Sequence, residues 1–328
     1  MSQFRRRQFL RGALAFAAAR WIPCSYAQRQ RVYRIGYLIT NSATDPATGS
    51  YWQSMDQRLR ELDYFEGRNL QVERRAAEAD LDRLPALATE LTARKVEVIV
   101  VGTDVAALAA KKVTSTTPIV FAAGGDPVRN GLVKSLAHPG GNVTGFTSFR
   151  EDLVGKQMQL LRETVPQIKR VAVIYSSSAP LSGMGLDALK AGAEGLNLSL
   201  HDIDTGLDNV LHAIEREKPG GLHALLTASV FRNRVRIAEF ALARRLPSVY
   251  GIAAHVEAGG LMSYSFNYSD SFRRAAEYVD RILKGAKPSE LPVQMSTKFE
   301  MAINLKTAKA LGLTIPQSVL QRADRLIE

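Results

Sequence analysis

Two short motifs in the first half of the sequence combine glycine with a carboxylate in a way that suits binding of a charged small molecule. Gly102-Thr103-Asp104 offers a hydroxyl, a carboxylate and the free N–H groups of a helix start, so it could hold an anion or pair Asp104 with an ammonium. Gly124-Gly125-Asp126-Pro127 allows close approach of the backbone and supplies Asp126. In both motifs the polar side chain could instead cap the following helix, and the sequence leaves both roles open.

Aromatic and polar side chains near other predicted strand ends complete the set of candidate ligand-binding residues. Tyr51 and Trp52 follow a polar, glycine-containing loop and could stack on a planar ligand, with packing in the core as the alternative. The remaining candidates are Ser176, Ser177, Ser229, Tyr250, Gly251 and Asn267. Together with Thr103, Asp104 and Asp126, they form the set of residues expected to line one ligand-binding cleft.

Arrangements typical of catalysis, metal binding or cofactor binding are scarce in this sequence. The five histidines show no metal-ligand spacing, and neither a Gly-x-Ser-x-Gly elbow nor a Walker-type phosphate loop is present. Ser182-Gly183-Met184-Gly185 lacks the third glycine of a dinucleotide-binding loop. We therefore expect no catalytic residue, no metal and no cofactor. The main alternative is an exported hydrolase that uses Asp104 or Asp126 with His255.

The candidate residues must be positioned by the strands that they follow. From Val32 onward, short β-branched runs alternate with stretches whose apolar residues recur every three or four positions. The predicted strands are Tyr33–Ile39, Leu70–Arg74, Val96–Val101, Ile119–Ala122 and Val143–Phe146, followed by Val171–Tyr175, Leu198–Ile203, Ala224–Thr227, Ser248–Gly251 and Leu261–Ser265. This alternation predicts an α/β protein with two doubly wound parallel-sheet lobes, in which ligands bind at the carboxyl ends of the strands.

The length of 328 residues favours two domains over a single core. We expect residues 31–147 plus about 268–290 to form the first lobe, and 148–267 plus about 293–328 to form the second. The tail of the chain contains a predicted helix over Ser269–Lys284, an extended segment over Val293–Leu305 and a last helix from Thr307. These elements are too short for a core of their own, so the chain must return to both lobes and cross between them more than once.

The first 27 residues have the features of an export signal. Arg6-Arg7 precedes Phe9-Leu10 and an alanine-rich apolar stretch, and Ser25-Tyr26-Ala27 places small residues at a cleavage site after Ala27. The paired arginines resemble the twin-arginine type. We therefore expect a periplasmic protein. Lipid attachment at Cys24, the only cysteine, is the alternative, although Trp-Ile-Pro ahead of it is a poor processing site.

A net charge of +11 could indicate a nucleic-acid partner, but the distribution of the charge argues against one. Five arginines, Arg5, Arg6, Arg7, Arg11 and Arg20, lie in the predicted signal, so cleavage lowers the charge by 5, from +11 to +6. This modest excess is spread along the chain, and we expect no nucleic-acid partner. No run approaches the roughly 20 apolar residues of a membrane-spanning helix, so we expect no stable membrane insertion.

Several segments in the same order resemble the solute-binding proteins of ABC importers, in the group that includes the tryptophan-binding TrpX-like proteins. They include residues 59–69 (LRELDYFEGRN), 125–128 (GDPV), 139–145 (PGGNVTG), 256–264 (VEAGGLMSY) and 304–312 (NLKTAKALG). The resemblance covers nearly all of the predicted mature chain. It implies a type I periplasmic binding protein fold, with two α/β lobes joined by a three-crossover hinge, and no catalysis.

The resemblance also implies partners and site positions. A ligand would be trapped by closure of the hinge and delivered to a permease and an ATPase. Thr103, Asp126 and the Tyr250-Gly251 loop correspond to cleft positions of the family. Two departures affect the expected ligand: Asp104 stands where relatives often have proline, and Ile252-Ala253-Ala254 stands where they often have a large polar residue. The ligand class therefore stays open between an amino acid, aromatic or branched-chain, and an aromatic acid, and a periplasmic sensor module is the third functional alternative.

Overall fold

The computed structural model describes residues 31–148, 151–179 and 182–328. The predicted export signal, its cleavage site after Ala27 and Cys24 lie outside the described residues. Among the helices in the described ranges, none is long and apolar enough to cross a membrane.

The first of two sheets contains six strands, all of whose pairings are parallel. In spatial order they are β11 (Gln294–Met295), β5 (Val143–Thr147), β4 (Ile119–Gly124), β3 (Val98–Val101), β1 (Tyr33–Ile39) and β2 (Leu70–Ala76). The strands β1 to β5 match the first predicted set. Every residue of β3 and β4 is buried, as expected for strands covered on both faces.

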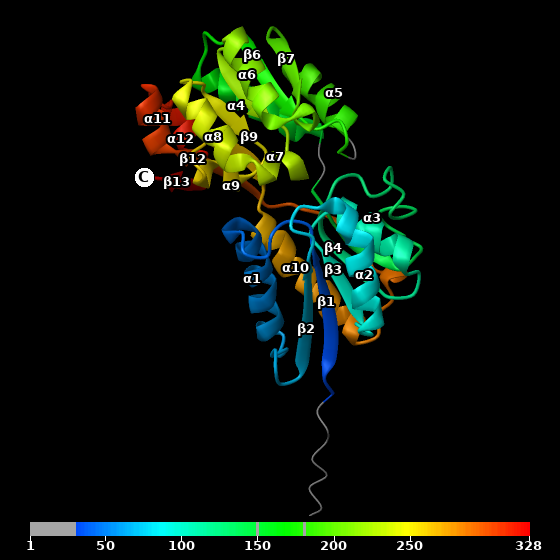
Figure 1. Ribbon diagram of the computed structural model, residues 1–328. Coiled ribbons are helices and arrows are strands. Elements are labelled where there is room, and N and C mark those ends of the chain that lie inside the picture. The colour runs from blue at the N-terminus through cyan, green and yellow to red at the C-terminus, as the bar shows by residue number, and fades with distance from the viewer. Residues whose placement is uncertain (1–30, 149–150, 180–181) are drawn as a thin grey trace, which may run out of the picture. The chain divides into compact units, whose positions relative to one another are not determined.

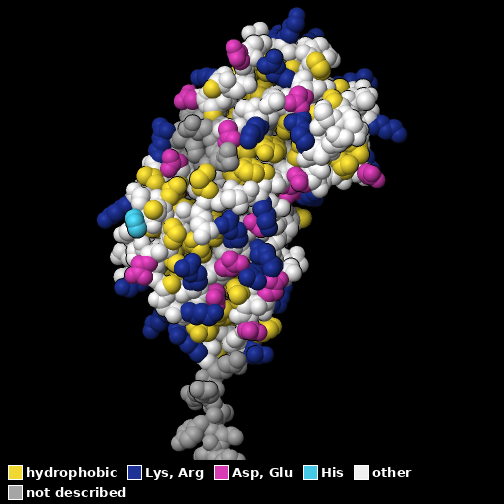
Figure 2. Space-filling view, turned by 180° about the vertical axis from the view of Figure 1, so that it is seen from behind, with side chains coloured by type: hydrophobic (Ala, Val, Ile, Leu, Met, Phe, Trp, Pro, Cys, Tyr) yellow, Lys and Arg dark blue, Asp and Glu magenta, His cyan; other side chains and the backbone are white. Residues whose placement is uncertain are grey.

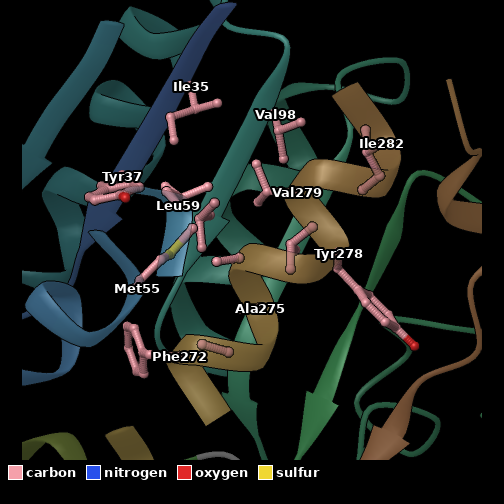
Figure 3. Packing of buried hydrophobic residues seen from close by; sticks show 14 of the residues in the cluster. Ile35, Tyr37, Met55, Leu59, Val98, Phe272, Ala275, Tyr278, Val279 and Ile282 are labelled. Atoms are coloured by element: carbon pink, nitrogen blue, oxygen red, sulfur yellow. The ribbon is translucent and has the colours of Figure 1, made fainter. Parts of the chain in front are cut away.

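Helices cover both faces of this first sheet, and each face has its own hydrophobic cluster. The helices α1 (Pro46–Glu61) and α10 (Tyr268–Leu283) pack on one face. The helices α2 (Leu84–Ala93) and α3 (Asp104–Val113) pack on the other. Figure 3 shows the first cluster, in which Ile35 and Tyr37 of β1 meet side chains of α1 and α10. Because side chains of a strand alternate between faces, Leu38 of β1 enters the second cluster instead. The sheet with these four helices is called the first lobe.

The second sheet contains seven strands and is parallel except where β12 joins it. In spatial order they are β13 (Arg325–Ile327), β12 (Phe299–Asn304), β10 (Met262–Phe266), β9 (Ser248–Tyr250), β8 (Gly221–Ala224), β6 (Arg170–Tyr175) and β7 (Asn197–Asp202). The antiparallel pair is β10 with β12. One face is covered by α4 (Glu151–Thr164), α5 (Ser182–Gly192), α11 (Leu305–Leu311) and α12 (Gln317–Leu320). The other is covered by α6 (Leu207–Glu217), α7 (Ala228–Arg232) and α8 (Arg234–Ala243), and α9 (Ala253–Glu257) packs beside β10 and β12. These elements are called the second lobe.

The chain passes between the lobes three times, as the resemblance implied. It leaves the first sheet after β5, returns after β10 to form α10, and leaves again between β11 and β12 (Figure 1). The last passage differs from the prediction, which assigned the whole extended segment Val293–Leu305 to the second lobe. Gln294 and Met295 pair with β5 of the first sheet, so the passage lies between Met295 and Phe299. The sequence does not show this switch because strands lie on both sides of it in one extended segment.

One strand of the second sheet also lies earlier than predicted. The prediction placed it over Ala224–Thr227, whereas β8 spans Gly221–Ala224. The prediction left Gly221 outside the strand, but a Cβ on Gly221 would lie 2.5 Å from Ile168 Cδ1 and 3.1 Å from the Pro247 carbonyl oxygen. Glycine is therefore required by close packing inside the strand. The residues that follow β8 lead instead to Thr227, which caps α7.

Acidic and basic side chains are interspersed on the surface. Figure 2 shows Lys and Arg scattered among Asp and Glu over one face. Arg74 bonds Glu66, and Arg58 bonds Glu61. Basic side chains are thus mixed with acidic ones over the pictured face, and some basic side chains form ion pairs with acidic ones.

Candidate ligand-binding pocket

A pocket with a volume of about 650 Å³ is lined by residues that follow the strands of both sheets. Seven of the predicted site residues belong to its lining: Tyr51, Trp52, Thr103, Asp104, Ser176, Ser229 and Gly251. Four predicted residues, all within the described ranges, are not part of it: Asp126, Ser177, Tyr250 and Asn267. The lining also contains residues that the prediction did not name, among them Thr40, Asn41, Gln157, Tyr268 and Phe272.

Two threonines join the neighbouring strands β1 and β3 at the edge of the pocket. The hydroxyls of Thr40 and Thr103 are 2.8 Å apart and hydrogen-bonded. Thr103 also caps α3, because its Oγ1 accepts a hydrogen bond from the Ala106 N–H at 3.4 Å. The sequence left two roles open for this motif, helix capping and ligand binding. Thr103 caps α3, so the Asp104 side chain can make another contact.

Asp104 connects the two glycine-containing motifs. Both of its carboxylate oxygens accept from the Gly125 N–H at 2.9 Å, and Oδ2 accepts from the Asn130 side-chain amide at 2.7 Å. Burial raises the pKa of Asp104 above its ordinary value; these hydrogen bonds oppose the shift, and the charge of Asp126 adds to it. The carboxylate is thus held in a fixed orientation at the pocket.

Asp126 has a structural role instead. Its Oδ1 accepts from the N–H groups of Val128 and Arg129, both at 3.0 Å, so it caps the turn that follows. Of the two roles left open for the second motif, the observed one is capping. The motif contributes to the pocket through the backbone of Gly124 and Gly125.

An aromatic group forms part of the pocket wall. The ring centroid of Tyr51 lies 5.6 Å from that of Tyr268 and 5.8 Å from that of Phe272. Trp52 touches the same group but stacks on Tyr37 at 4.3 Å and belongs mainly to the core. Burial raises the pKa of Tyr51 well above its ordinary value and that of Tyr268 to about 12, so both phenols stay neutral. Tyr268 lies in a predicted strand-end loop, but no residue spacing distinguished it.

The second lobe contributes an amide held in place by a buried histidine. The Gln157 side chain donates to the Tyr264 carbonyl at 2.7 Å, and its Oε1 lies 2.8 Å from His223 Nε2. Burial lowers the pKa of His223 to about 3, so the ring is neutral. Because an amide oxygen only accepts, His223 Nε2 carries the proton. A glutamine in mid-helix gives no sequence signal for such a site.

Other predicted residues of the second lobe divide between the pocket and the core. The Ser176 hydroxyl lies at the pocket and donates to Asp204 at 2.9 Å. Ser177 is exposed, and its N–H donates to Asp202. Tyr250 is fully buried and stacks on His255, with centroids 4.7 Å apart. Asn267, in the connection to α10, caps that helix by accepting from the Asp270 N–H at 2.8 Å.

The structure does not bring together the residues that the hydrolase alternative requires. His255 is 1% exposed, and burial is the main cause that lowers its pKa to about 3. It is not part of the pocket lining, whereas Asp104 is. Among the described residues, no histidine lines the pocket, so no imidazole stands beside either aspartate as a general base there.

Contacts between the lobes border the pocket. Asp45 caps α1 with Oδ1 and pairs through Oδ2 with Arg234 of the second lobe. The Arg234 guanidinium also lies 4.6 Å from the ring centroid of Phe231, which lines the pocket. Burial acts to raise the pKa of Asp45, but the hydrogen bonds from the Thr48 N–H and Arg234 lower it overall. A hydrophobic cluster joins Ala47 of the first lobe to Phe231, Ile252 and Ala254 of the second.

Comparison with known proteins agrees with this arrangement. A structure titled as an ABC domain in complex with L-Trp, from Streptococcus pneumoniae, is similar with a TM-score of 0.83 and 26% identity, covering 90% of this chain and 100% of that one. A conserved domain protein from Vibrio cholerae has the same TM-score and coverage at 28% identity. A tyrosine-binding protein of Clostridioides difficile is 24% identical over 290 residues, which are 88% of this chain and 82% of the relative.

The two lobes and three crossovers constitute the type I periplasmic binding protein fold, which the resemblance implied. The sequence pattern of the ABC transporter substrate binding proteins matches residues 39–327, which is nearly the whole described chain. The protein therefore belongs to the ABC transporter substrate-binding protein family.

Proposed function

We propose that this substrate-binding protein captures an amino acid or an aromatic acid in the pocket between its lobes and delivers it to the permease and ATPase of an ABC importer. The observation that carries the proposal is the pocket, whose 41 lining residues come from strand ends and helices of both lobes. Its volume of about 650 Å³ lies within the roughly 300–1,000 Å³ typical of small-molecule sites. Closure of two lobes on such a site traps a ligand without a chemical step.

The aromatic wall and the names of two relatives support an aromatic side chain on the ligand. Tyr51, Tyr268 and Phe272 offer ring faces and edges at spacings that suit stacking with a further ring. One similar protein is named for tyrosine and another was solved with L-Trp. We include residues Tyr51, Trp52, Thr103, Asp104, Ser176, Ser229 and Gly251 in the proposed site, and add Asn41, Gln157, Tyr268 and Phe272.

The test is a ligand screen on the mature protein. The protein is unfolded and refolded to remove bound solute, and its thermal unfolding is followed with the twenty amino acids and a set of aromatic acids. We expect a rise in the midpoint with at least one compound, since binding to the folded state alone stabilises it. No response to any compound of either class would contradict the proposal.

We further propose that the chain is exported through the twin-arginine route and acts in the periplasm as a non-catalytic protein. Cleavage after Ala27 predicts that the mature protein recovered from the periplasm starts at Gln28. Mass spectrometry of the intact protein measures this directly. A membrane-bound form acylated at Cys24 would instead favour lipid attachment, and replacement of Arg6-Arg7 by lysines is expected to prevent export.

Loss of the ion pair between the lobes is expected to weaken ligand binding. The side chains of Arg234 and Asp45 are only 12% and 18% exposed, so the pair is partly shielded from water. Arg234→Gln is expected to reduce affinity by about 1 kcal/mol, about fivefold, because this contact joins the two lobes and would stabilise their closure on a ligand. Titration calorimetry with the ligand found in the screen measures the effect.

Arg236 provides the matched control. It pairs with Asp208 of the same lobe, and both side chains are more than half exposed. Arg236→Gln is expected to leave affinity unchanged. Equal affinities for Arg234→Gln, Arg236→Gln and the wild type would show that the Arg234 contact plays no part in closure.

A further inference from the structure

At one end of the pocket, two polar residues follow two adjacent strands at equivalent positions. β1 and β3 are parallel neighbours with Leu38 opposite Val101. Continuing this register places Thr40 opposite Thr103, and the hydrogen bond between their hydroxyls is consistent with it. The next residues, Asn41 and Asp104, therefore leave the two strands at equivalent positions, and both line the pocket.

Both of these residues present oxygen acceptors. The side-chain oxygen of Asn41 is shielded from water and has no hydrogen-bond partner among the described residues. The Asp104 carboxylate accepts from the Gly125 N–H and the Asn130 amide, which are neutral groups. In the described part of the chain, the side-chain partners of Asp104 are the Gly125 N–H and the Asn130 amide, and no lysine, arginine or histidine pairs with it. A buried carboxylate without a cation and a buried oxygen without a donor are both energetically costly.

Positive charge in the lining lies far from this end of the pocket. Lys112 is the one lysine or arginine among the described lining residues. It follows Asp104 by eight positions on α3, which corresponds to about 12 Å along a helix axis. Tyr268, by contrast, lines the same pocket, and the charge of Asp104 contributes to its raised pKa after burial.

We propose that Asp104 is a specificity-determining residue that pairs with the ammonium group of the ligand, with the Asn41 side-chain oxygen as a second acceptor. An ammonium supplies the missing positive charge and three N–H donors at once. The site therefore selects an α-amino acid with an aromatic or large apolar side chain and rejects the corresponding carboxylic acid that lacks the amine. This inference rests on the proposed function, that the pocket binds a small solute.

The experiment compares ligands that differ only in the amine. L-Tryptophan is paired with 3-indolepropionate, L-phenylalanine with 3-phenylpropionate and L-leucine with 4-methylpentanoate, and affinities are measured by calorimetry for the refolded wild type and for Asp104→Asn. We expect the wild type to bind at least one amino acid more tightly than its partner acid by about tenfold or more. In Asp104→Asn, affinity for that amino acid is expected to fall by about tenfold to a hundredfold, while affinity for the acid stays the same or rises.

The matched control is Asp126→Asn. Asp126 is the carboxylate of the second motif, outside the pocket lining, and asparagine can accept the same two backbone hydrogen bonds. This variant is expected to keep the preference of the wild type. Circular dichroism and the thermal midpoint check that each variant folds, and the comparison of paired ligands in the wild type needs no variant.

The remaining outcomes overturn the inference in distinguishable ways. Equal loss of affinity for both members of a pair in Asp104→Asn would show that Asp104 only holds the loop at Gly125. A wild type that binds the acids as tightly as the amino acids would show that the amine is not recognised, although the pocket would still bind a solute. A wild type that responds to no compound in the wider screen would contradict the proposed function itself.

Discussion

Acidification from pH 7 to pH 5 is expected to lower the free energy of unfolding by about 4 kcal/mol through two buried histidines. His223 and His255 are 0% and 1% exposed, and their pKa values are lowered to about 3, mainly by burial. Between about pH 6.5 and pH 3 the unfolded chain binds a proton at each ring, whereas the folded protein does not. Stability therefore rises with pH in this window and is lost as the pH falls.

Urea unfolding at pH 5, 6 and 7 measures this dependence. Each histidine is expected to contribute about 1.4 kcal/mol per pH unit below pH 6.5. His255→Phe keeps a ring to stack on Tyr250 and should remove half of the histidine contribution. His212→Gln, at an exposed position of α6, is the control and should leave the slope as in the wild type. If the free energy of unfolding of His255→Phe depended on pH as steeply as that of the wild type, the His255 imidazole of the wild type would have to be protonated in the folded state as well.

Gly145→Ala is expected to destabilise the protein by about 3 to 5 kcal/mol, combining backbone strain with overpacking. Gly145 has a φ of 152°, and a Cβ at this position would lie 2.0 Å from the Phe121 carbonyl oxygen. That oxygen belongs to the neighbouring strand β4, which cannot retreat without disturbing the sheet. The clash is therefore with backbone and not with a side chain that could rotate away.

The same position affects the pocket. Phe121 pairs with Gly145, and the register then shifts so that Gly124 pairs with Thr147. This irregularity precedes Gly125, whose N–H holds the Asp104 carboxylate. We expect Gly145→Ala to lower both the urea midpoint and ligand affinity. Gly141→Ala is the control, since a Cβ there meets no atom within 4 Å, and wild-type stability for both variants would contradict the prediction.

Most of the fold could be predicted from the spacing of apolar residues, because the characteristic spacings in strands and in helices have local causes. The β-branched runs of β1 and β3 and the three- and four-residue spacing of α2 follow from which faces each element buries. Predictions failed where close packing decided the outcome. The start of β8 depends on Gly221 fitting beneath Ile168, and the switch from β11 to β12 depends on which sheet edge is free.

The candidate site could be predicted only in part. Strand ends indicated Thr103, Asp104 and Ser176, because the carboxyl ends of parallel strands lie at one edge of a sheet. Asp126 and Asn267 are also polar residues that follow strands, yet their side chains cap a turn and a helix. The direction of each polar side chain depends on which N–H groups the fold brings within reach. Residue type and position along the chain do not contain that information.

The sequence by itself determined the α/β class, the resemblance to substrate-binding proteins and the polar strand ends, since these depend on residue types and on local period. The tertiary structure alone decided that Asp104 bonds Gly125 and that Gln157 is held by His223. It also decided that Arg234 reaches Asp45. These partners are 21, 66 and 189 residues apart in the chain. Contacts over such distances form only when the sheets and their helices pack, so they depend on the whole core.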